Sequence, residues 1–438
     1  MSRSHLLLCQ DLRLALQKIT SSPPILMLRG DQWGHYRQYR QSKPPPTLEP
    51  IQQNLAKTQP LKPHIYRTGE WAALEEDVGG RLERGKTLKV VSWNIYMHRF
   101  WAEERISAAL KYLRKVFGDK PDSTVIMLQE VRRESLRTIL EDAWVQQIFM
   151  LSNINPPQDL YFDIPDESFI LKLVEWKSAP YFTLMLISRD LGVLNCFRVP
   201  FVTNMGRDAL VIDIPIANKD MSSSARESLR LCTTHLESLP DDRGYRPSQL
   251  ALISTLLKGV PPMKYKIAAG LVGGDMNSIE KSEHEFHKRD DINLKDVWED
   301  VPAPPVPQLK PFQKDLTYGR AKGNTYCYQS SGRNRWMKRL DKFFYTGSLE
   351  TSPLSEIQDV AGKLGRLGIG LKTEVDAWEW TASPWTLKRN KVLNKPIKEY
   401  WPLHAFSGQH LQRKDLVHVK HECWVSDHFG IAVGVKVV

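Results

Sequence analysis

The sequence predicts an α/β domain in which strands and helices pack in layers. Short apolar runs recur from residue 87 to residue 438, and segments with helical spacing lie between them. Several runs are apolar on both faces, which is typical of strands covered on both sides. Strand clusters interleaved with helices indicate α/β layers. Many of the runs also end in a polar residue.

Eight apolar runs bounded by turn signals are the strand candidates. They are TLKVVSWNI (87–95), STVIMLQEV (123–131), FTLMLISR (182–189), DALVIDIPI (208–216), RLCTTHLES (230–238), KIAAGLVGGD (266–275), RLDKFFYTG (339–347) and HFGIAVGVKVV (428–438). Residues 102–118 and 246–260 carry helical spacing. The second of these begins with Arg246-Pro247, and proline is favoured in a first helical turn.

Two regions depart from this pattern. Residues 1–85 hold aromatic residues, arginines and a proline run, which predict a largely irregular N-terminal extension to a domain at 86–438. An insertion at about 348–425 is too long for a plain connection and should have its own structure. Its tryptophans and lysines fit either a nucleic-acid stacking surface or simple packing onto the domain.

The totals narrow the class of protein. A net charge of +11 and a pI of about 9.2 suit a polyanionic partner, nucleic acid first and an anionic membrane surface second, although a basic protein with neither also fits. Five cysteines without a CxxC pair argue against a disulfide framework and for a reducing compartment. No run reaches the length of a membrane span.

We therefore expect an intracellular monomer of the nucleus or cytoplasm. The stretch HLLLCQDLRLALQKI (5–19) is amphipathic and poor in acids, so it also fits a mitochondrial presequence, although an ordinary helix fits it better.

Polar side chains close most of the strand candidates. They are Asn94, Glu130, His235, Asp275, Asn277, Asp341, Asp427 and His428. Each has a plainer interpretation alone; LVGGDMNS (271–278), for example, can be a polar turn. As a set they lie where α/β sheets place ligands. Alternation along a strand would also direct Asp275 and Asn277 to the same side.

The chemistry of this set indicates hydrolysis of a phosphate ester. Carboxylate and amide oxygens suit Mg²⁺ or Mn²⁺. With such an ion, an aspartate can activate water and a protonated histidine can stabilise the developing charge. No Walker loop, GxSxG elbow or HExxH helix is present, which disfavours a P-loop nucleotidase, a serine hydrolase of that fold and a zinc protease.

The motifs WN, QE, THLES, GGDMN, RLD and SDH follow one another in this order. They resemble the endonuclease/exonuclease/phosphatase superfamily, the DNase I-like fold, over residues 87–438 apart from the insertion. The resemblance implies a four-layer α/β sandwich, two packed mixed β-sheets flanked by helices. THLES followed by Arg246 and Gln249 narrows it to the tyrosyl-DNA phosphodiesterase 2 branch, which cuts 5′-phosphotyrosyl bonds left by trapped topoisomerase II. WNIYMHRF departs from that branch, since it lacks the Asp-Gly that usually follows WNI.

The resemblance also implies roles for single residues. Glu130, Asn94 and Asp427 would belong to the metal site for Mg²⁺ or Mn²⁺. Asp275 would deprotonate the attacking water with help from Asn277, His235 and His428 would hold the phosphoryl oxygens, and Asp341 would keep His428 charged. Arg207, Ser238 and Arg246 would contact the substrate.

These roles predict a Mg²⁺-dependent phosphodiesterase acting on DNA 5′ ends, including protein adducts and a topoisomerase-derived peptide. An abasic-site endonuclease, an RNA exonuclease and a phospholipid phosphodiesterase use the same chemistry and remain alternatives. A binding protein of the same fold without catalysis is a third class, and it would be expected to have lost a catalytic residue.

Overall fold

The computed structural model describes residues 51–74, 79–98, 101–157, 181–217, 227–238, 243–260, 265–300, 323–329, 337–380 and 416–438. All of them belong to one compact unit, Leu48–Val438, and the other unit of the chain, Met1–Thr47, lies outside the described residues. Within the described part, no helix is both long and apolar enough to span a membrane.

One large sheet has seven strands. Their order is β1 (Gln59–Pro60), β8 (Asn195–Pro200), β9 (Asp208–Pro215), β10 (Glu227–His235), β11 (Lys266–Asp275), β13 (Asp341–Gly347) and β12 (Lys295–Asp296). β10 and β11 are parallel, whereas β9 and β13 run antiparallel to them. We call this sheet A.

The other large sheet, sheet B, has ten strands. Their order is β15 (Val360–Ala361), β16 (Leu364–Leu367), β19 (Gly430–Val437), β4 (Leu88–Asn94), β5 (Thr124–Val131), β7 (Phe182–Ser188), β6 (Phe149–Leu151), β2 (His64–Arg67) and β3 (Glu70–Ala73), and β14 (Leu349–Ser352) also pairs with β19. β4 and β5 form a parallel pair inside an otherwise antiparallel neighbourhood.

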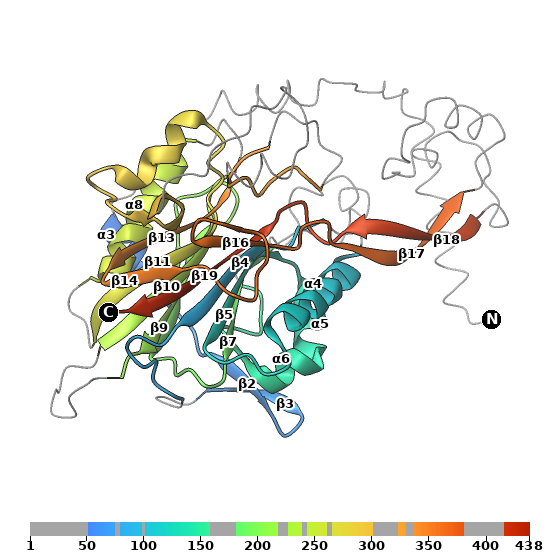
Figure 1. Cartoon of the computed structure of the whole chain (residues 1–438), viewed down its shortest axis with the longest axis horizontal. Coiled ribbons are helices and arrows are strands. Elements are labelled where there is room, and N and C mark those ends of the chain that lie inside the picture. The colour runs from blue at the N-terminus through green and yellow to red at the C-terminus, as the bar shows by residue number, and fades with distance from the viewer. Residues whose placement is uncertain are drawn as a thin grey trace, which may run out of the picture. The chain divides into compact units, whose positions relative to one another are not determined.

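The two sheets pack face to face, with helices on their outer sides (Figure 1). The core between the sheets contains side chains of both, such as Val90 and Met127 from sheet B and Leu231 and Leu271 from sheet A. Apolar positions at helical spacing explain the outer helix at residues 102–117, whose buried stripe includes Ile106, Ala109, Leu110 and Leu113. The helices are α4 (Ala102–Phe117), α5 (Arg133–Glu141) and α6 (Ala143–Ile148) on sheet B, and α3 (Ile51–Ala56) and α8 (Tyr245–Lys258) on sheet A. The predicted α/β sandwich is confirmed.

The predicted N-terminal extension is wrong for residues 51–73. These residues form α3 and three strands, and both sheets use them: β1 pairs with β8, and β2 pairs with β6 and β3. The strands are only two to four residues long, so their alternation is too short to be read as a strand pattern. Residues 1–50 of the predicted extension lie outside the described residues.

The predicted insertion at 348–425 is partly a continuation of sheet B. β14 and β16 pair with β19, and β17 (Lys372–Trp380) and β18 (Leu416–Trp424) form a separate two-stranded ribbon. On one face of the ribbon Lys372 donates to Glu422 and Lys420 donates to Glu374, each at 2.8 Å. This face therefore presents paired charges, while residues 381–415, which hold most of the predicted basic surface, lie outside the described residues.

The pairing of residues 51–73 predicts that truncation at residue 86 destabilises the domain. Ile65 and Leu74 are buried in the core between the sheets, and burying each such side chain contributes about 1.5–3 kcal/mol. We expect the chain 86–438 to unfold at a temperature several degrees below the chain 48–438 in a calorimetric scan. Equal melting temperatures for the two chains would contradict this.

Candidate active site

The register of three strands of sheet A places three of the predicted residues in one row. His235 pairs with Asp275 across the parallel strands β10 and β11, and Asp275 pairs with Asp341 across the antiparallel strands β11 and β13. Side chains at paired positions project to the same face of a sheet. The row therefore follows from the pairing of the strands and needs no loop to assemble it.

The paired glycines of GGDMN permit this close pairing. A Cβ at Gly274 would lie 2.0 Å from the backbone oxygen of Thr234, and a Cβ at Gly273 would lie 2.3 Å from Cε1 of Phe343. Any side chain at either position would push β10 or the core apart. The glycines thus keep the strand end that carries Asp275 in register with its neighbours.

Sheet B contributes Asn94 and Glu130 from the ends of its two parallel strands. Asn94 Nδ2 donates to Glu130 Oε1 and to Asp275 Oδ2, each at 3.1 Å, and so links the two sheets. Met97 N donates to Glu130 Oε2 at 2.5 Å. Glu130 sits at an irregularity in the pairing of β5 and β7 and has a φ of 61°, which is unusual for a residue other than glycine. Strain of this kind is concentrated at functional sites.

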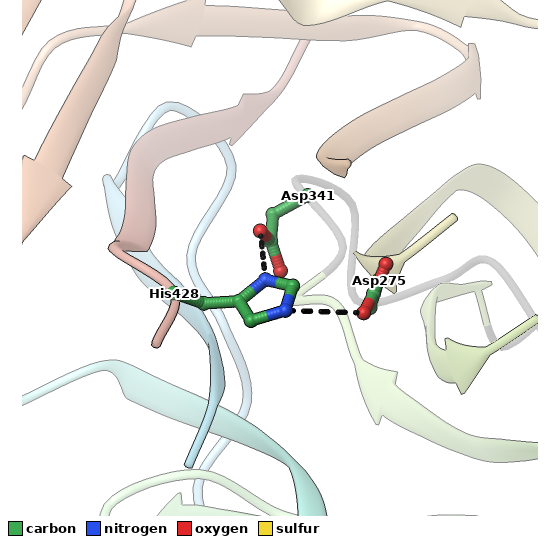
Figure 2. Close-up of side chains that lie close together, drawn as sticks. All are labelled: Asp275, Asp341 and His428. Carbon is green, nitrogen blue, oxygen red and sulfur yellow. Dashed lines mark hydrogen bonds and ion pairs between the residues drawn. The ribbon is translucent and has the colours of Figure 1, made fainter. Parts of the chain in front are cut away.

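His428 lies between Asp341 and Asp275 (Figure 2). Its Nδ1 is 2.8 Å from Asp341 Oδ2, and its Nε2 is 3.7 Å from Asp275 Oδ2. The segment before β19 is fixed because Ser426 Oγ donates to Asn94 O and accepts from His428 N. His428 is therefore held on one side by a carboxylate and directed toward another.

His235 is held differently. Arg207 Nη1 lies 3.0 Å from His235 Nδ1, and His235 Nε2 lies 3.4 Å from Asp275 Oδ2. A guanidinium can only donate, so Nδ1 of His235 must accept and Nε2 must carry the proton. Both histidines consequently point a ring nitrogen at the same oxygen of Asp275.

The surroundings shift the pKa values of the two histidines in opposite directions. Burial opposes the charge of His428, but the negative charges of Asp341 and Asp275 outweigh it and raise the pKa of His428 well above its usual range. Burial, followed by the positive charges of Arg207 and His428, lowers the pKa of His235 well below its usual range. The site thus combines one imidazolium and one neutral imidazole.

The site holds more negative than positive groups. Burial raises the pKa values of Asp275 and Asp427; nearby carboxylates add to both shifts and His428 reduces them. Among the described residues, Asp427 Oδ1 and Asp341 Oδ1 are buried without a hydrogen-bond partner. Buried oxygens that lack a partner beside further carboxylates are the donor set of a hard divalent cation. The residues present therefore fit a magnesium or manganese ion.

No protein-family model and no curated protein matches the chain, but solved structures resemble it. Truncated TDP2 from Caenorhabditis elegans has a TM-score of 0.45 at 17% identity, over 81% of this chain and 99% of that chain. An endonuclease/exonuclease/phosphatase family protein from Bacteroides thetaiotaomicron has a TM-score of 0.45 at 10% identity, over 81% and 98%. The human Nocturnin catalytic domain has a TM-score of 0.42 at 14% identity, over 81% and 95%.

The second of these structures is named as a protein of the superfamily that the sequence motifs resemble.

Three of the predicted residues have surroundings that differ from those expected. Asn277 has a φ of 46° and donates from Nδ2 to Leu236 O and from its backbone to Asp275 Oδ1, so it orients Asp275 and joins the two strand ends. Arg246 is 2% exposed, pairs with Glu283 and donates to Glu237 O. Arg246 is thus paired within the protein, and its contact with substrate stays a prediction. Ser238 Oγ lies 3.0 Å from Met205 Sδ.

Several residues of the site carried no signal in the sequence. Thr325 Oγ1 accepts from Asp341 N at 3.2 Å, and Tyr326 packs on His428 with ring centroids 4.8 Å apart. Tyr181 lies 5.9 Å from the ring of His235. None of the three closes a predicted strand, so only tertiary packing brings them to the site.

A second group of possible ligands is already neutralised. His287, Asp296 and Glu299 lie together, but Asp296 pairs with Arg339 at 2.7 Å and Glu299 pairs with Lys288 at 3.2 Å. A cation there would have to displace both basic side chains. The electrostatic demand for a metal is therefore concentrated at the site of Glu130, Asp275 and Asp427.

The opposite shifts of the two histidines can be measured. In protein treated with EDTA at pH 7, imidazole nitrogen NMR should find His428 doubly protonated and His235 neutral. In Asp341→Asn, His428 should lose its proton at a lower pH, because the main charge that raises its pKa is gone. Asp213→Asn, which alters a buried carboxylate paired with Arg230, is the control.

The raised pKa of His428 also makes the stability of the folded domain depend on pH. A folded-state pKa above the unfolded value of about 6.5 stabilises the domain below that pH, and this contribution is lost as the pH rises through the folded-state value. A His428 that titrates near 6.5 in the wild type would contradict the arrangement.

Proposed function

We propose that this chain is a divalent-metal-dependent phosphodiesterase that hydrolyses 5′-phosphotyrosyl or related phosphodiester bonds at DNA ends. The observation that carries the proposal is the convergence of His235, His428 and Asn94 on a single oxygen of Asp275. A phosphate placed beside this oxygen would meet two imidazole N–H donors and one carboxylate base. The net charge of +11 favours a polyanionic substrate.

The metal would be held by Glu130 and Asp427. Asn94 would support it indirectly, because its Nδ2 is committed to Glu130 and Asp275 and its Oδ1 accepts from Tyr96 N at 3.0 Å. When bound, Mg²⁺ or Mn²⁺ would polarise a phosphoryl oxygen as a Lewis acid. Phosphodiester anions approach such a site only when its negative charge has been offset.

Asp275 is the base that accepts a proton from the attacking water. Asn277 N holds Oδ1 at 2.9 Å and leaves Oδ2 facing the histidines. Burial raises the pKa of Asp275 toward neutrality, which is where a general base is most effective. His428, kept charged by Asp341, and His235, donating from Nε2, would stabilise the phosphoryl oxygens as negative charge develops.

The protonation of the cluster favours a good leaving group. His428 is the imidazolium of the described cluster, and its raised pKa makes it a weak acid. A phenolate, with a pKa of about 10 for its conjugate acid, needs less protonation on departure than an alkoxide. This supports a phosphotyrosyl bond over an internal sugar–phosphate bond as the preferred substrate.

The proposal predicts release of tyrosine from an oligonucleotide carrying a 5′-phosphotyrosine. The reaction should leave a 5′-phosphate, require Mg²⁺ and stop with EDTA. Asp275→Asn should lower kcat by about 10²–10⁴-fold, the usual contribution of a general base. An oligonucleotide with an internal abasic site, RNA and phospholipid vesicles are run beside it.

Cleavage of one of these other substrates alone would support phosphodiester hydrolysis but assign a different substrate to the protein. If the wild-type protein is inactive on all of these substrates, the proposal is wrong and a binding protein of the same fold is favoured.

The metal ligands make a separate prediction. Glu130→Gln should raise the Mg²⁺ concentration for half-maximal activity at least tenfold, because the amide is a weaker ligand than the carboxylate. Asp213→Asn should leave that concentration unchanged. A Glu130→Gln enzyme with the Mg²⁺ dependence of the wild type would show that the metal lies elsewhere.

A further inference from the structure

The segment between β8 and β9, residues 201–207, is held in place by hydrogen bonds to the hydroxyl group of Thr203. Thr203 Oγ1 accepts from Met205 N at 3.0 Å and from Arg207 N at 3.1 Å. The same hydroxyl donates to Glu237 Oε2 at 2.5 Å. One side chain thus satisfies two backbone groups of the segment and ties it to the HLES motif.

Glu237 is the anchor of this segment. It is fully buried, and its Oε1 accepts from Asn204 N at 3.1 Å. Its own backbone N–H donates to Gln249 Oε1 at 3.0 Å, while Gln249 Nε2 donates to Val202 O at 3.1 Å. Glu237 and Gln249 together fix the segment from two directions. Among the described residues, the side chains of Glu237 and Gln249 make their hydrogen bonds to this segment and to each other, and not to the row.

The segment ends at Arg207, which does contact that row. Arg207 is 4% exposed, donates toward His235 Nδ1 at 3.0 Å, and has its guanidinium carbon 5.0 Å from the centre of the Tyr181 ring. The backbone of Arg207 is held by Thr203, so a shift of the segment would move the guanidinium away from the imidazole.

We infer that Glu237 and Thr203 are positioning residues: they hold Arg207 against His235 and thereby fix which ring nitrogen of His235 carries the proton. This inference rests on the proposed function for its catalytic consequence, but the tautomer itself does not depend on it. The motif THLES would then supply both the histidine and the group that controls it.

The other tautomer of His235, with the proton on Nδ1, also has a hydrogen-bond acceptor nearby. Other residues must therefore determine which nitrogen carries the proton. His235 Nδ1 lies 3.9 Å from Glu130 Oε1. A proton on Nδ1 would be attracted to that carboxylate and would leave Nε2 as an acceptor facing Asp275. In that state His235 could not donate to a phosphoryl oxygen. The guanidinium of Arg207 blocks it by occupying Nδ1 as a donor.

The test compares Thr203→Val, which has the shape of threonine without its hydroxyl, with Thr203→Ser, which keeps the hydroxyl. Imidazole nitrogen NMR on EDTA-treated protein reports the tautomer, with the His235 signal assigned from a His235→Asn sample. Wild type and Thr203→Ser should show His235 as the Nε2–H tautomer alone, and Thr203→Val should show a mixture. Asp213→Asn, a buried carboxylate five residues along the register from the site, is the control for general destabilisation.

An unchanged tautomer in Thr203→Val would overturn the inference. Should this variant fail to fold, Glu237→Gln replaces it, since the amide keeps the shape of the side chain but loses one acceptor for the segment.

Activity gives an independent readout. Thr203→Val should lower kcat about tenfold with KM within twofold, and Thr203→Ser should restore it. In an Arg207→Ala background the same change should have no further effect, because both substitutions act through His235. A full tenfold loss in that background would contradict the inference. A fixed tautomer in a protein without phosphodiesterase activity would refute the proposed function and leave the positioning role standing.

Discussion

The pairing of β10, β11 and β13 is the constraint on which the site depends. Once these strands are in register, His235, Asp275 and Asp341 must lie side by side. A slip of one residue would send their side chains to the opposite face. The close approach at Gly274 makes such a slip costly, because the strands are already in contact there. The alignment of these three side chains is therefore a property of the sheet and not of loops.

Electrostatics then gives the two histidines of the site different chemistry. His428 is charged because Asp341 accepts from it, and His235 is neutral because burial, and then the positive charge of Arg207, oppose its protonation. Two residues of the same type at one oxygen thereby acquire different roles through their outer neighbours. The excess of carboxylates around Glu130 and Asp427 provides the reason for a metal, and the second cluster at His287 lacks that excess.

The sequence predicted those parts of the fold that repeat over enough residues to be seen. Strands such as β4 and β11 were predicted, and so were the polar residues that close them, whereas β17 and β18, of nine residues each, were not among the strand candidates. The two-residue β1 and the short β2 and β3 were not, since pairing and not pattern makes them strands. β8 was hidden by Arg198, a buried charge whose partners Asp208 and Thr183 come from other strands. The partner of Arg246 could not be predicted for the same reason: Glu283, which pairs with it, is 37 residues away.

The left-handed backbone conformation of Glu130 lowers the stability of the fold at a position that the proposed activity needs. A residue other than glycine at a φ of 61° costs free energy of order 1–3 kcal/mol that a glycine would not cost. Selection for thermal stability alone would therefore favour replacing this carboxylate, and with it a ligand of the proposed metal site. The strand irregularity that aims Glu130 into the cluster is thus a place where a thermostabilised variant of this protein could gain melting temperature and lose its chemistry in one step.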